Sequence, residues 1–269
     1  MSKPKVILLV PTYNSSDYFD YWARNIYAMR PKPDLVIFAE NNSTDDTLKN
    51  IINFKLPHEI IRVWFRDDIY KQIQSEDNEY LNICHIRQLL LTRARQLNPD
   101  YVIFVDDDVI PPTNLISEII KAEKDLVGGY YYRNFPEGMW ICSRFYNPTN
   151  GKPMYVDEYW LKYLCQKESP KYVKGKLIIA IQTSGGCLAL SRKIINDKRL
   201  TFYPRAFEEK YSAEDFGYCV KAEKLGYKVY VHRFLRCFHI LDKKTFRPWN
   251  EKPDGSRNCV EYKWGETTI

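Results

Sequence analysis

The sequence predicts an α/β protein with a mostly parallel central sheet flanked by helices, and two observations support this prediction. Short apolar runs alternate with longer segments whose apolar residues recur every three or four positions, as strands and helices do in βαβ units. The apolar runs are also uninterrupted, which is typical of strands buried on both faces of a parallel sheet. With 269 residues, 45% of them hydrophobic, the chain can build one large core.

The expected elements alternate regularly in the first half of the chain and less regularly in the second. The expected strands span residues 5–10, 35–39, 60–65, 101–105, 126–132, 177–181, 187–190 and 227–231. One expected helix carries Tyr18, Trp22, Ile26 and Met29 on one face, and a second contains Leu48, Ile51 and Ile52. Three further helices are expected over residues 80–97, 113–122 and 212–225. Residues 133–176 are rich in Tyr, Trp, Pro and Lys, and their weak periodicity predicts no regular element.

Three consecutive carboxylates, Asp106, Asp107 and Asp108, directly follow the expected strand at 101–105. Like charges beside a core repel one another, and a divalent cation relieves that repulsion. In an extended chain Asp106 and Asp108 would point to one side and Asp107 to the other. Oxygen ligands of this kind suit Mg²⁺ or Mn²⁺. The alternative is a solvated acidic turn without a ligand.

Bulk composition narrows the functional classes. The net charge of +6 suits an anionic ligand or association with a membrane surface, but it is not concentrated enough to predict nucleic-acid binding. Seven scattered cysteines without CxxC pairs predict reduced thiols. No apolar stretch reaches the roughly 18 residues of a membrane span, and the N-terminus leads into a strand without a secretory signal. These features predict a cytoplasmic protein and leave its oligomeric state open.

Polar clusters follow three of the expected strands, at the sheet edge where α/β proteins bind ligands. They are Pro11-Thr12-Tyr13-Asn14, the stretch from Glu40 to Thr47, and the aspartate triplet. Together with Glu214-Asp215 and Gly226-Tyr227-Lys228, they resemble the GT-A glycosyltransferases, most closely family 2, over about residues 5 to 240. The resemblance implies a Rossmann-like GT-A fold and an enzyme that moves a sugar from a nucleotide-diphosphate sugar, a UDP- or GDP-sugar, to an acceptor hydroxyl.

The resemblance assigns the first two strand ends to the nucleotide sugar. The residues expected around it there are Pro11, Thr12, Tyr13, Asn14, Glu40 and Asn42. Glu40 is expected to accept hydrogen bonds from the ribose or the base. The alternative for Thr12 and Asn14 is ordinary helix capping.

Further donor contacts are expected from Arg87, Asp106, Asp107, Gly185 and Gly186. Arg87 stands near the position of a family arginine that reaches the nucleotide; the alternative is an exposed helix arginine. The two glycines lie between apolar runs, and without a Cβ atom they let the backbone approach the donor sugar closely. A simple tight turn explains them equally well.

The resemblance places catalysis at Glu214-Asp215, with Asp215 as general base and Glu214 holding acceptor hydroxyls. Adjacent carboxylates near a metal-bound diphosphate shift in pKa, so that one can take a proton. The alternative is that Asp215 caps a helix together with Ser212. For the metal, the resemblance implies Asp108, Asp106 and His239, while a structural role is the alternative for the histidine.

The sequence therefore predicts a Mn²⁺- or Mg²⁺-dependent glycosyltransferase that inverts the anomeric centre and acts on a carbohydrate, glycolipid or glycoprotein acceptor. One alternative is a retaining, mannosyltransferase-like GT-A enzyme, which the long helix, the aspartates and Pro111-Pro112 also resemble. Another is a non-catalytic carbohydrate-binding protein built on the aromatic-rich residues 133–176. A nucleotidylyltransferase is disfavoured, because Pro11-Thr12-Tyr13-Asn14 contains no glycine for a phosphate loop.

No Pro/Gly/Ser-rich linker divides the chain. We expect one domain over residues 1–240, with a nucleotide-sugar half at 1–110 and an acceptor half at 111–240. Residues 241–269 are expected to form a polar C-terminal extension.

Overall fold

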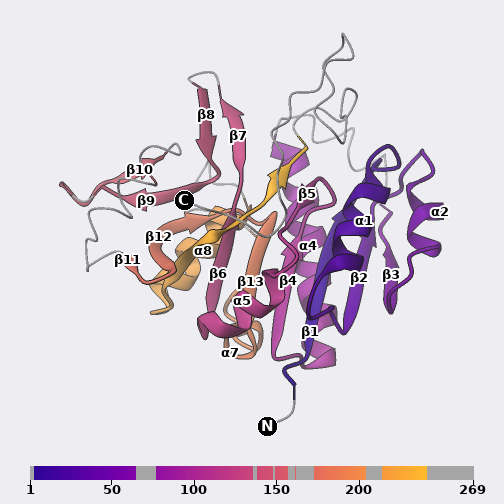
Figure 1. Cartoon of the computed structure of the whole chain (residues 1–269), viewed down its shortest axis with the longest axis horizontal. Helices are drawn as coiled ribbons and strands as arrows, with labels where there is room; N and C mark the ends of the chain where they lie inside the picture. The colour runs from indigo at the N-terminus through magenta and orange to yellow at the C-terminus, as the bar shows by residue number, and fades with distance from the viewer. Residues whose placement is uncertain are drawn as a thin grey trace.

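Helices cover both faces of one large sheet in the computed structural model, which describes residues 3–64, 77–135, 138–147, 149–156, 161, 173–203 and 214–240 (Figure 1). The strands of this sheet are β1 (Val6–Thr12), β2 (Leu35–Glu40), β3 (His58–Arg62), β4 (Tyr101–Val105), β6 (Leu126–Tyr130), β9 (Ser143–Tyr146), β10 (Pro153–Tyr155), β11 (Val173–Lys174), β12 (Leu177–Thr183), β13 (Cys187–Ser191) and β14 (Val229–Arg236). The helices are α1 (Phe19–Ala28), α2 (Thr47–Ile52), α4 (Asp77–Leu97), α5 (Leu115–Ala122), α7 (Arg192–Ile195) and α8 (Glu214–Lys224).

The strand order is β10-β9-β12-β14-β6-β13-β4-β1-β2-β3, with β11 beside β12. Strands β4, β1, β2 and β3 are parallel neighbours, and β6 pairs in parallel with β14. Strand β13 runs antiparallel between β4 and β6, and the pairs that β12 forms with β9, β11 and β14 are antiparallel as well. The expected α/β class is confirmed, with its regular parallel part in the first half of the chain.

Two hydrophobic cores, one on each face of the sheet, explain the uninterrupted apolar runs. In β1, Ile7 and Leu9 join the core under α4, α7 and α8, whereas Val6, Leu8 and Val10 join the core under α1, α2 and α5. All five side chains are at most 1% exposed. Successive side chains of a strand point to opposite faces, so burial on both faces requires every position to be apolar.

The structure corrects several expected element boundaries. Strand β3 ends at Arg62 rather than at residue 65, because it pairs in register with β2, which ends at Glu40. Strand β14 runs on to Arg236, five residues beyond the expected end. The stretch 133–176, expected to lack regular elements, holds β9, β10, β11 and most of a small sheet of β7 (Tyr132–Phe135) and β8 (Gly138–Ile141). These strands are too short to show a clear period.

A second small sheet joins distant parts of the chain at the edge where β1, β2 and β4 end. It pairs β5 (Val109–Ile110) antiparallel with β15 (Phe238–His239), and His239 lies opposite Val109. The backbone N–H of Ile240 also donates to the Asp108 carbonyl at 2.9 Å. This pairing carries His239 to the aspartate triplet across 130 residues of sequence. Ser212 and the expected extension at 241–269 lie outside the described residues.

Candidate active site

The aspartate triplet forms a turn rather than the extended strand end expected from the sequence. The Val109 N–H donates to the Asp106 carbonyl at 3.0 Å, which closes the turn. The Asp107 side chain, 6% exposed, accepts a hydrogen bond from the Tyr13 backbone N–H at 3.1 Å. Asp106 and Asp108 instead approach Arg87 and His239. Asp107 therefore connects the end of β1 with the end of β4.

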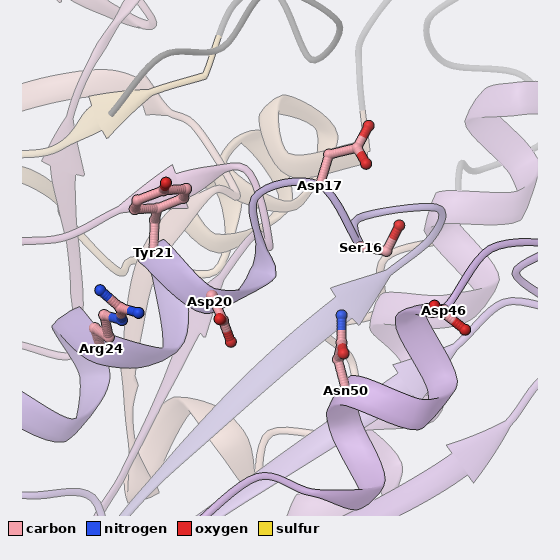
Figure 2. A pocket seen from close by; sticks show the side chains of 7 residues that line it. All are labelled: Ser16, Asp17, Asp20, Tyr21, Arg24, Asp46 and Asn50. Atoms are coloured by element: carbon pink, nitrogen blue, oxygen red, sulfur yellow. The ribbon is translucent and has the colours of Figure 1, made fainter. Parts of the chain in front are cut away.

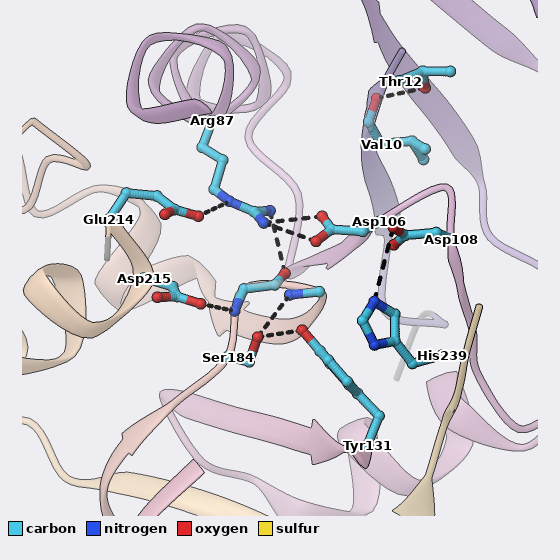
Figure 3. Close-up of polar contacts among 12 residues, drawn as sticks. Val10, Thr12, Arg87, Asp106, Asp108, Tyr131, Ser184, Glu214, Asp215 and His239 are labelled. Atoms are coloured by element: carbon cyan, nitrogen blue, oxygen red, sulfur yellow. Dashed lines mark hydrogen bonds and ion pairs between the residues drawn. The ribbon is translucent and has the colours of Figure 1, made fainter. Parts of the chain in front are cut away.

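Arg87 is the centre of a buried charge network (Figure 3). Its side chain extends from α4 with only 3% exposure, so the alternative of an exposed helix arginine is wrong. Its Nε donates to Glu214 Oε1 at 2.8 Å, its Nη1 to the Gly185 carbonyl at 3.2 Å, and its Nη2 to Asp106 Oδ2 at 3.0 Å. One guanidinium thus joins the end of β4, the turn before β13 and the start of α8.

The charges in this network shift one another's protonation. Burial alone would lower the pKa of Arg87, but the carboxylates of Asp106, Glu214 and Asp215 outweigh it and raise that pKa. The pKa of Asp106 is raised by burial and by the charges of Asp108 and Glu214, although Arg87 opposes the shift. An arginine that stays protonated balances part of the negative charge collected at this edge.

Asp215 is a buried carboxylate at the first turn of α8 and is only 7% exposed. Its Oδ2 accepts a hydrogen bond from the Gly185 N–H at 2.6 Å, and its Oδ1 accepts one from the Phe216 N–H at 2.7 Å. Burial, followed by the negative charge of Glu214, raises the pKa of Asp215 to about 7, against the opposing effects of Arg87 and the two amides. A carboxylate with that pKa can exchange a proton near neutral pH.

The two glycines of the turn before β13 are required by close contacts within the protein. A Cβ atom on Gly185 would lie 2.7 Å from Arg87 Cζ, and one on Gly186 would lie 2.5 Å from the Tyr131 hydroxyl and 3.0 Å from Asp106 Oδ2. The Tyr131 hydroxyl also forms a hydrogen bond with the Ser184 hydroxyl. The glycines therefore let this turn pack against the charged network. The backbone at these glycines was expected to approach the donor sugar closely, and in the structure it approaches other side chains of the protein.

Asp108 and His239 face each other at a distance compatible with two ligands of one cation. The His239 Nε2 lies 3.8 Å from Asp108 Oδ2, and both side chains are about one-fifth exposed. The His239 Nδ1 lies 3.3 Å from the Tyr132 carbonyl, which can only accept, so Nδ1 carries the hydrogen. In the neutral imidazole Nε2 then offers a lone pair toward the carboxylate. Two ligand atoms about 2.0 to 2.2 Å from one ion lie roughly 3 to 4 Å apart.

The expected third metal ligand, Asp106, is turned toward Arg87 instead. Among the described residues, no group of three or more His, Cys, Asp or Glu side chains is arranged to hold a metal. Asp106 is drawn away because the buried guanidinium, 2.9 Å from its Oδ1, supplies the positive charge that it needs. Of the three expected ligands, Asp108 and His239 therefore face each other, and Asp106 faces Arg87. Mg²⁺ is commonly held by one or two carboxylates, with substrate phosphates and water completing the coordination.

The end of β1 is organised by hydrogen bonds to the loop after β2, not by capping of α1. The N-cap of α1 is Tyr18, without a side-chain cap bond, so the capping alternative for Thr12 and Asn14 is wrong. The Asn14 side chain accepts from the Thr44 N–H at 2.9 Å, and the Asn14 N–H donates to the Ser43 hydroxyl at 3.1 Å. Pro11 and Thr12 are buried within β1, while Tyr13 is 51% exposed.

Glu40 lies beside this loop, is fully buried and has protein partners on both oxygens. Its Oε1 accepts from the Ser43 N–H at 2.5 Å, and its Oε2 accepts from Arg62 Nε at 3.1 Å. Because the Glu40 side chain has no exposed surface, a ribose or base cannot reach either oxygen without a rearrangement of this edge. Asn42 is exposed and adopts a left-handed backbone, with a φ of 50°.

Sequence reasoning missed three polar residues of this edge: Arg62, Tyr131 and Ser184. Nothing in the sequence marks Arg62 as a site residue. The strand was expected to continue to residue 65, which puts Arg62 in its middle rather than at its end. Ser184 could have been found, since it directly precedes the two glycines. Tyr131 is the middle one of three consecutive tyrosines, and the sequence does not distinguish it from its two neighbours.

A pocket of about 420 Å³ lies elsewhere, between α1 and α2 (Figure 2). Its lining residues are Ser16, Asp17, Asp20, Tyr21, Arg24, Asp46 and Asn50. None of the residues expected to bind the donor, the metal or the acceptor is among them. We therefore place the candidate active site at the strand ends around Arg87, where the buried charges are.

Solved structures match the chain along most of its length, and this likeness, together with the strand order, shows a GT-A fold. A mannosyltransferase from Pyrobaculum calidifontis, PcManGT, solved in complex with GDP-Man and Mn²⁺, has a TM-score of 0.54 and 17% identity, covering 93% of this chain and 60% of its own. Residues 1–349 of S. aureus TarS have a TM-score of 0.53 and 17% identity, covering 87% of this chain and 60% of theirs. The same TarS fragment in complex with UDP-GlcNAc has a TM-score of 0.51 and covers 92% of this chain.

These matches concern the fold. The chain spans about three-fifths of the length of the PcManGT and TarS 1–349 chains. No protein-family model matches the sequence, and no curated protein matches it. Within the part of the chain that the structure describes, none of the helices is long and apolar enough to cross a bilayer.

Proposed function

We propose that this protein is a metal-dependent glycosyltransferase that moves a sugar from a UDP- or GDP-sugar to an acceptor hydroxyl. One observation carries the proposal: Arg87 joins Asp106, at the end of a parallel strand, to Glu214, which adjoins the buried Asp215 at the start of α8. Carboxylates with raised pKa values, as Asp106 and Asp215 have here, are typical of a catalytic centre at the carboxyl edge of an α/β sheet. The similar structures that carry GDP-Man or UDP-GlcNAc support a nucleotide-sugar donor.

Asp108 and His239 are the proposed protein ligands of Mn²⁺ or Mg²⁺. The carboxylate oxygen and the bare Nε2 face each other, and neither can donate a hydrogen to the other when the imidazole is neutral. The cation supplies charge neutralisation for the diphosphate leaving group. The Mn²⁺ in the PcManGT complex supports this assignment.

Asp215 is the proposed general base. Each of its oxygens accepts one backbone hydrogen bond and retains a second lone pair, which can receive the proton of the acceptor hydroxyl. As that proton moves to Asp215, the acceptor oxygen forms a bond to the anomeric carbon, and the bond from that carbon to the diphosphate oxygen breaks. Attack from the side opposite the leaving group inverts the anomeric centre. Arg87 holds Glu214 Oε1, so Oε2 is the oxygen proposed to bind an acceptor hydroxyl.

Retaining transfer is the second candidate, because both oxygens of Asp215 already have backbone donors and the carboxylate is buried. In a retaining enzyme Asp215 would hold the turn at Gly185 and would not take a proton. The anomeric configuration of the product, determined by NMR, separates the two mechanisms.

We further propose that residues 1–240 act as one domain, with donor binding in residues 1–110 and acceptor binding in residues 111–240. Strand β4 is the boundary strand, since it pairs with β1 on one side and with β13 on the other. The acceptor is proposed to be a carbohydrate, glycolipid or glycoprotein, and association with a membrane surface would be consistent with the net charge of +6.

The test combines thermal unfolding with donor hydrolysis. Purified protein is mixed with UDP, GDP, UDP-sugars and GDP-sugars, with Mn²⁺ or with EDTA, and release of the nucleoside diphosphate is followed. We expect a donor to stabilise the fold, by about 2.7 kcal/mol at 100 times its Kd, and to be hydrolysed only with metal. Binding without hydrolysis or transfer would favour the carbohydrate-binding alternative. Absence of any stabilisation by a nucleoside diphosphate with metal would contradict the proposed function.

A further inference from the structure

Thr12, Glu40 and Arg62 form a row across three adjacent parallel strands at the carboxyl edge of the sheet. Thr12 lies opposite Glu40 in the pairing of β1 with β2, and Glu40 lies opposite Arg62 in the pairing of β2 with β3. The hydrogen bonds continue one residue beyond this row, from the Asn41 N–H to the Thr12 carbonyl at 3.0 Å and from the Val63 N–H to the Glu40 carbonyl at 2.8 Å. Because neighbouring strands lie about 4.8 Å apart, Arg62 is within about 10 Å of the end of β1.

Within this row Glu40 orients Arg62 and is itself buried away from a ligand. One oxygen of Glu40 accepts from the Ser43 N–H, and the other holds Arg62 Nε at 3.1 Å. The Arg62 side chain is 40% exposed, whereas Glu40 is fully buried. Among the described residues, Arg62 makes no hydrogen bond through Nη1 or Nη2. The surface of this edge therefore presents the hydrogen-bond donors of a fixed guanidinium, where sequence reasoning expected an acceptor.

An exposed aromatic ring adjoins those donors. Arg62 Cζ lies 4.4 Å from the centre of the Trp64 ring, and Trp64, two residues beyond the end of β3, is 61% exposed. Tyr13, which follows Thr12, is 51% exposed. Tyr13 and Trp64, two of the large exposed apolar side chains, thus lie just after Thr12 and Arg62, the two outer members of the row. The guanidinium lies over the Trp64 ring, and an exposed ring that carries such a cation is a surface on which a nucleobase can stack.

We propose that Arg62 recognises a guanine base and that Trp64 provides a stacking surface for it, so that the donor is a GDP-sugar. This inference rests on the proposed function. With Nε held by Glu40, a guanidinium can still offer two neighbouring N–H groups. Guanine presents two neighbouring acceptors, O6 and N7, that match them. Adenine places an amino donor beside N7, and uracil places its N3–H between its two carbonyl oxygens, so neither base accepts both hydrogen bonds.

The test is isothermal titration calorimetry of the full chain with GDP, UDP and ADP, each with Mn²⁺. The preference expected for GDP is about 5- to 150-fold over either other nucleotide, as for a bidentate arginine–guanine pair. Arg62→Lys keeps the charge but loses the paired donors, so this preference should disappear while some GDP binding remains. Trp64→Ala should weaken GDP and UDP binding alike, because stacking does not depend on the base. Arg24→Lys, at an exposed position on α1, is the matched control and should leave every Kd unchanged.

Three results would overturn the inference, and they separate it from the proposed function. If UDP or ADP binds as tightly as GDP, or if Arg62→Lys keeps the wild-type preference, the assignment to guanine is wrong and the glycosyltransferase proposal stands. If no nucleotide binds with Mn²⁺ to a protein that circular dichroism shows to be folded, both proposals fail.

Discussion

Replacing Asp215 by Asn should separate catalysis from stability, because the structure gives the two effects different dependences on pH. The substitution keeps the shape of the side chain and removes its ability to take a proton. Loss of a general base typically lowers the rate about 10²- to 10⁴-fold. In the wild type, a pKa of about 7 leaves roughly 10% of Asp215 ionised at pH 6 and roughly 90% at pH 8. The wild-type turnover should therefore rise about ninefold over that interval, whereas the variant should show no such rise.

The effect on stability should change sign with pH. Burial raises the pKa of Asp215 from 3.8 to about 7, so the folded state binds the proton more tightly than the unfolded chain. Stability that this group contributes below about pH 4 is lost progressively as the pH rises from about 4 to 7, and the loss is about 4 kcal/mol when complete. Asn cannot ionise and avoids this loss. Its single oxygen leaves the Gly185 or the Phe216 N–H without an acceptor, at a cost of about 1–3 kcal/mol.

Asp215→Asn should therefore be at least as stable as the wild type at pH 8 and less stable at pH 4. The measurements are urea unfolding at both pH values and single-turnover transfer on the same preparations. Glu223→Gln is the matched control, because it lies on the same helix, is exposed and should change neither quantity by much. A wild-type rate in folded Asp215→Asn would refute the assignment of the base and favour retaining transfer. If the stability of the variant relative to the wild type is lower at pH 8 than at pH 4, the assignment of a buried carboxylate that ionises near pH 7 is wrong.

The remaining predictions concern the metal, the buried arginine and the glycine turn. Asp108→Ala should abolish the stabilisation of the fold by GDP or UDP with Mn²⁺, measured by thermal unfolding, while Asp107→Asn keeps an acceptor for the Tyr13 N–H and should retain it. Arg87→Met should lower the free energy of unfolding by about 3–5 kcal/mol, because it leaves two carboxylates without their buried partner; a loss below about 1 kcal/mol in urea would contradict the network. Gly186→Ala should cost about 1–3 kcal/mol through contact with the Tyr131 hydroxyl, and the double variant with Tyr131→Phe should recover part of that loss. Equal melting temperatures for the single and double variants would contradict this contact.

The core of the fold was predictable because its signal is local. Residues 6–10 are apolar at every position, and only a strand covered on both faces buries them all. The inward direction of Arg87 was also available from the sequence. It lies four residues after Ile83 and three before Leu90, on the side of α4 that carries the apolar residues. An arginine on that side of a helix must find buried partners or leave the interface.

The polar contacts of the site were less predictable, because they depend on the register of strands that lie far apart in the sequence. Glu40 has Arg62 as its partner only because β2 and β3 pair in one register, and a shift of one residue would direct the arginine to the other face. The turn at Asp106 likewise depends on β5, a two-residue strand that exists through its pairing with β15. Neither pairing leaves a periodic pattern in the sequence.

The short pairing of β15 with β5 also sets the order in which the protein can become functional during synthesis. The last strand of the large sheet, β14, ends at Arg236, three residues before His239. A ribosome therefore completes every described strand of that sheet before it adds the histidine that faces Asp108. A chain that ended at Arg236 would keep every described strand of the large sheet but would lack half of the proposed metal-ligand pair. The two residues of β15 therefore connect the fold to the proposed metal site.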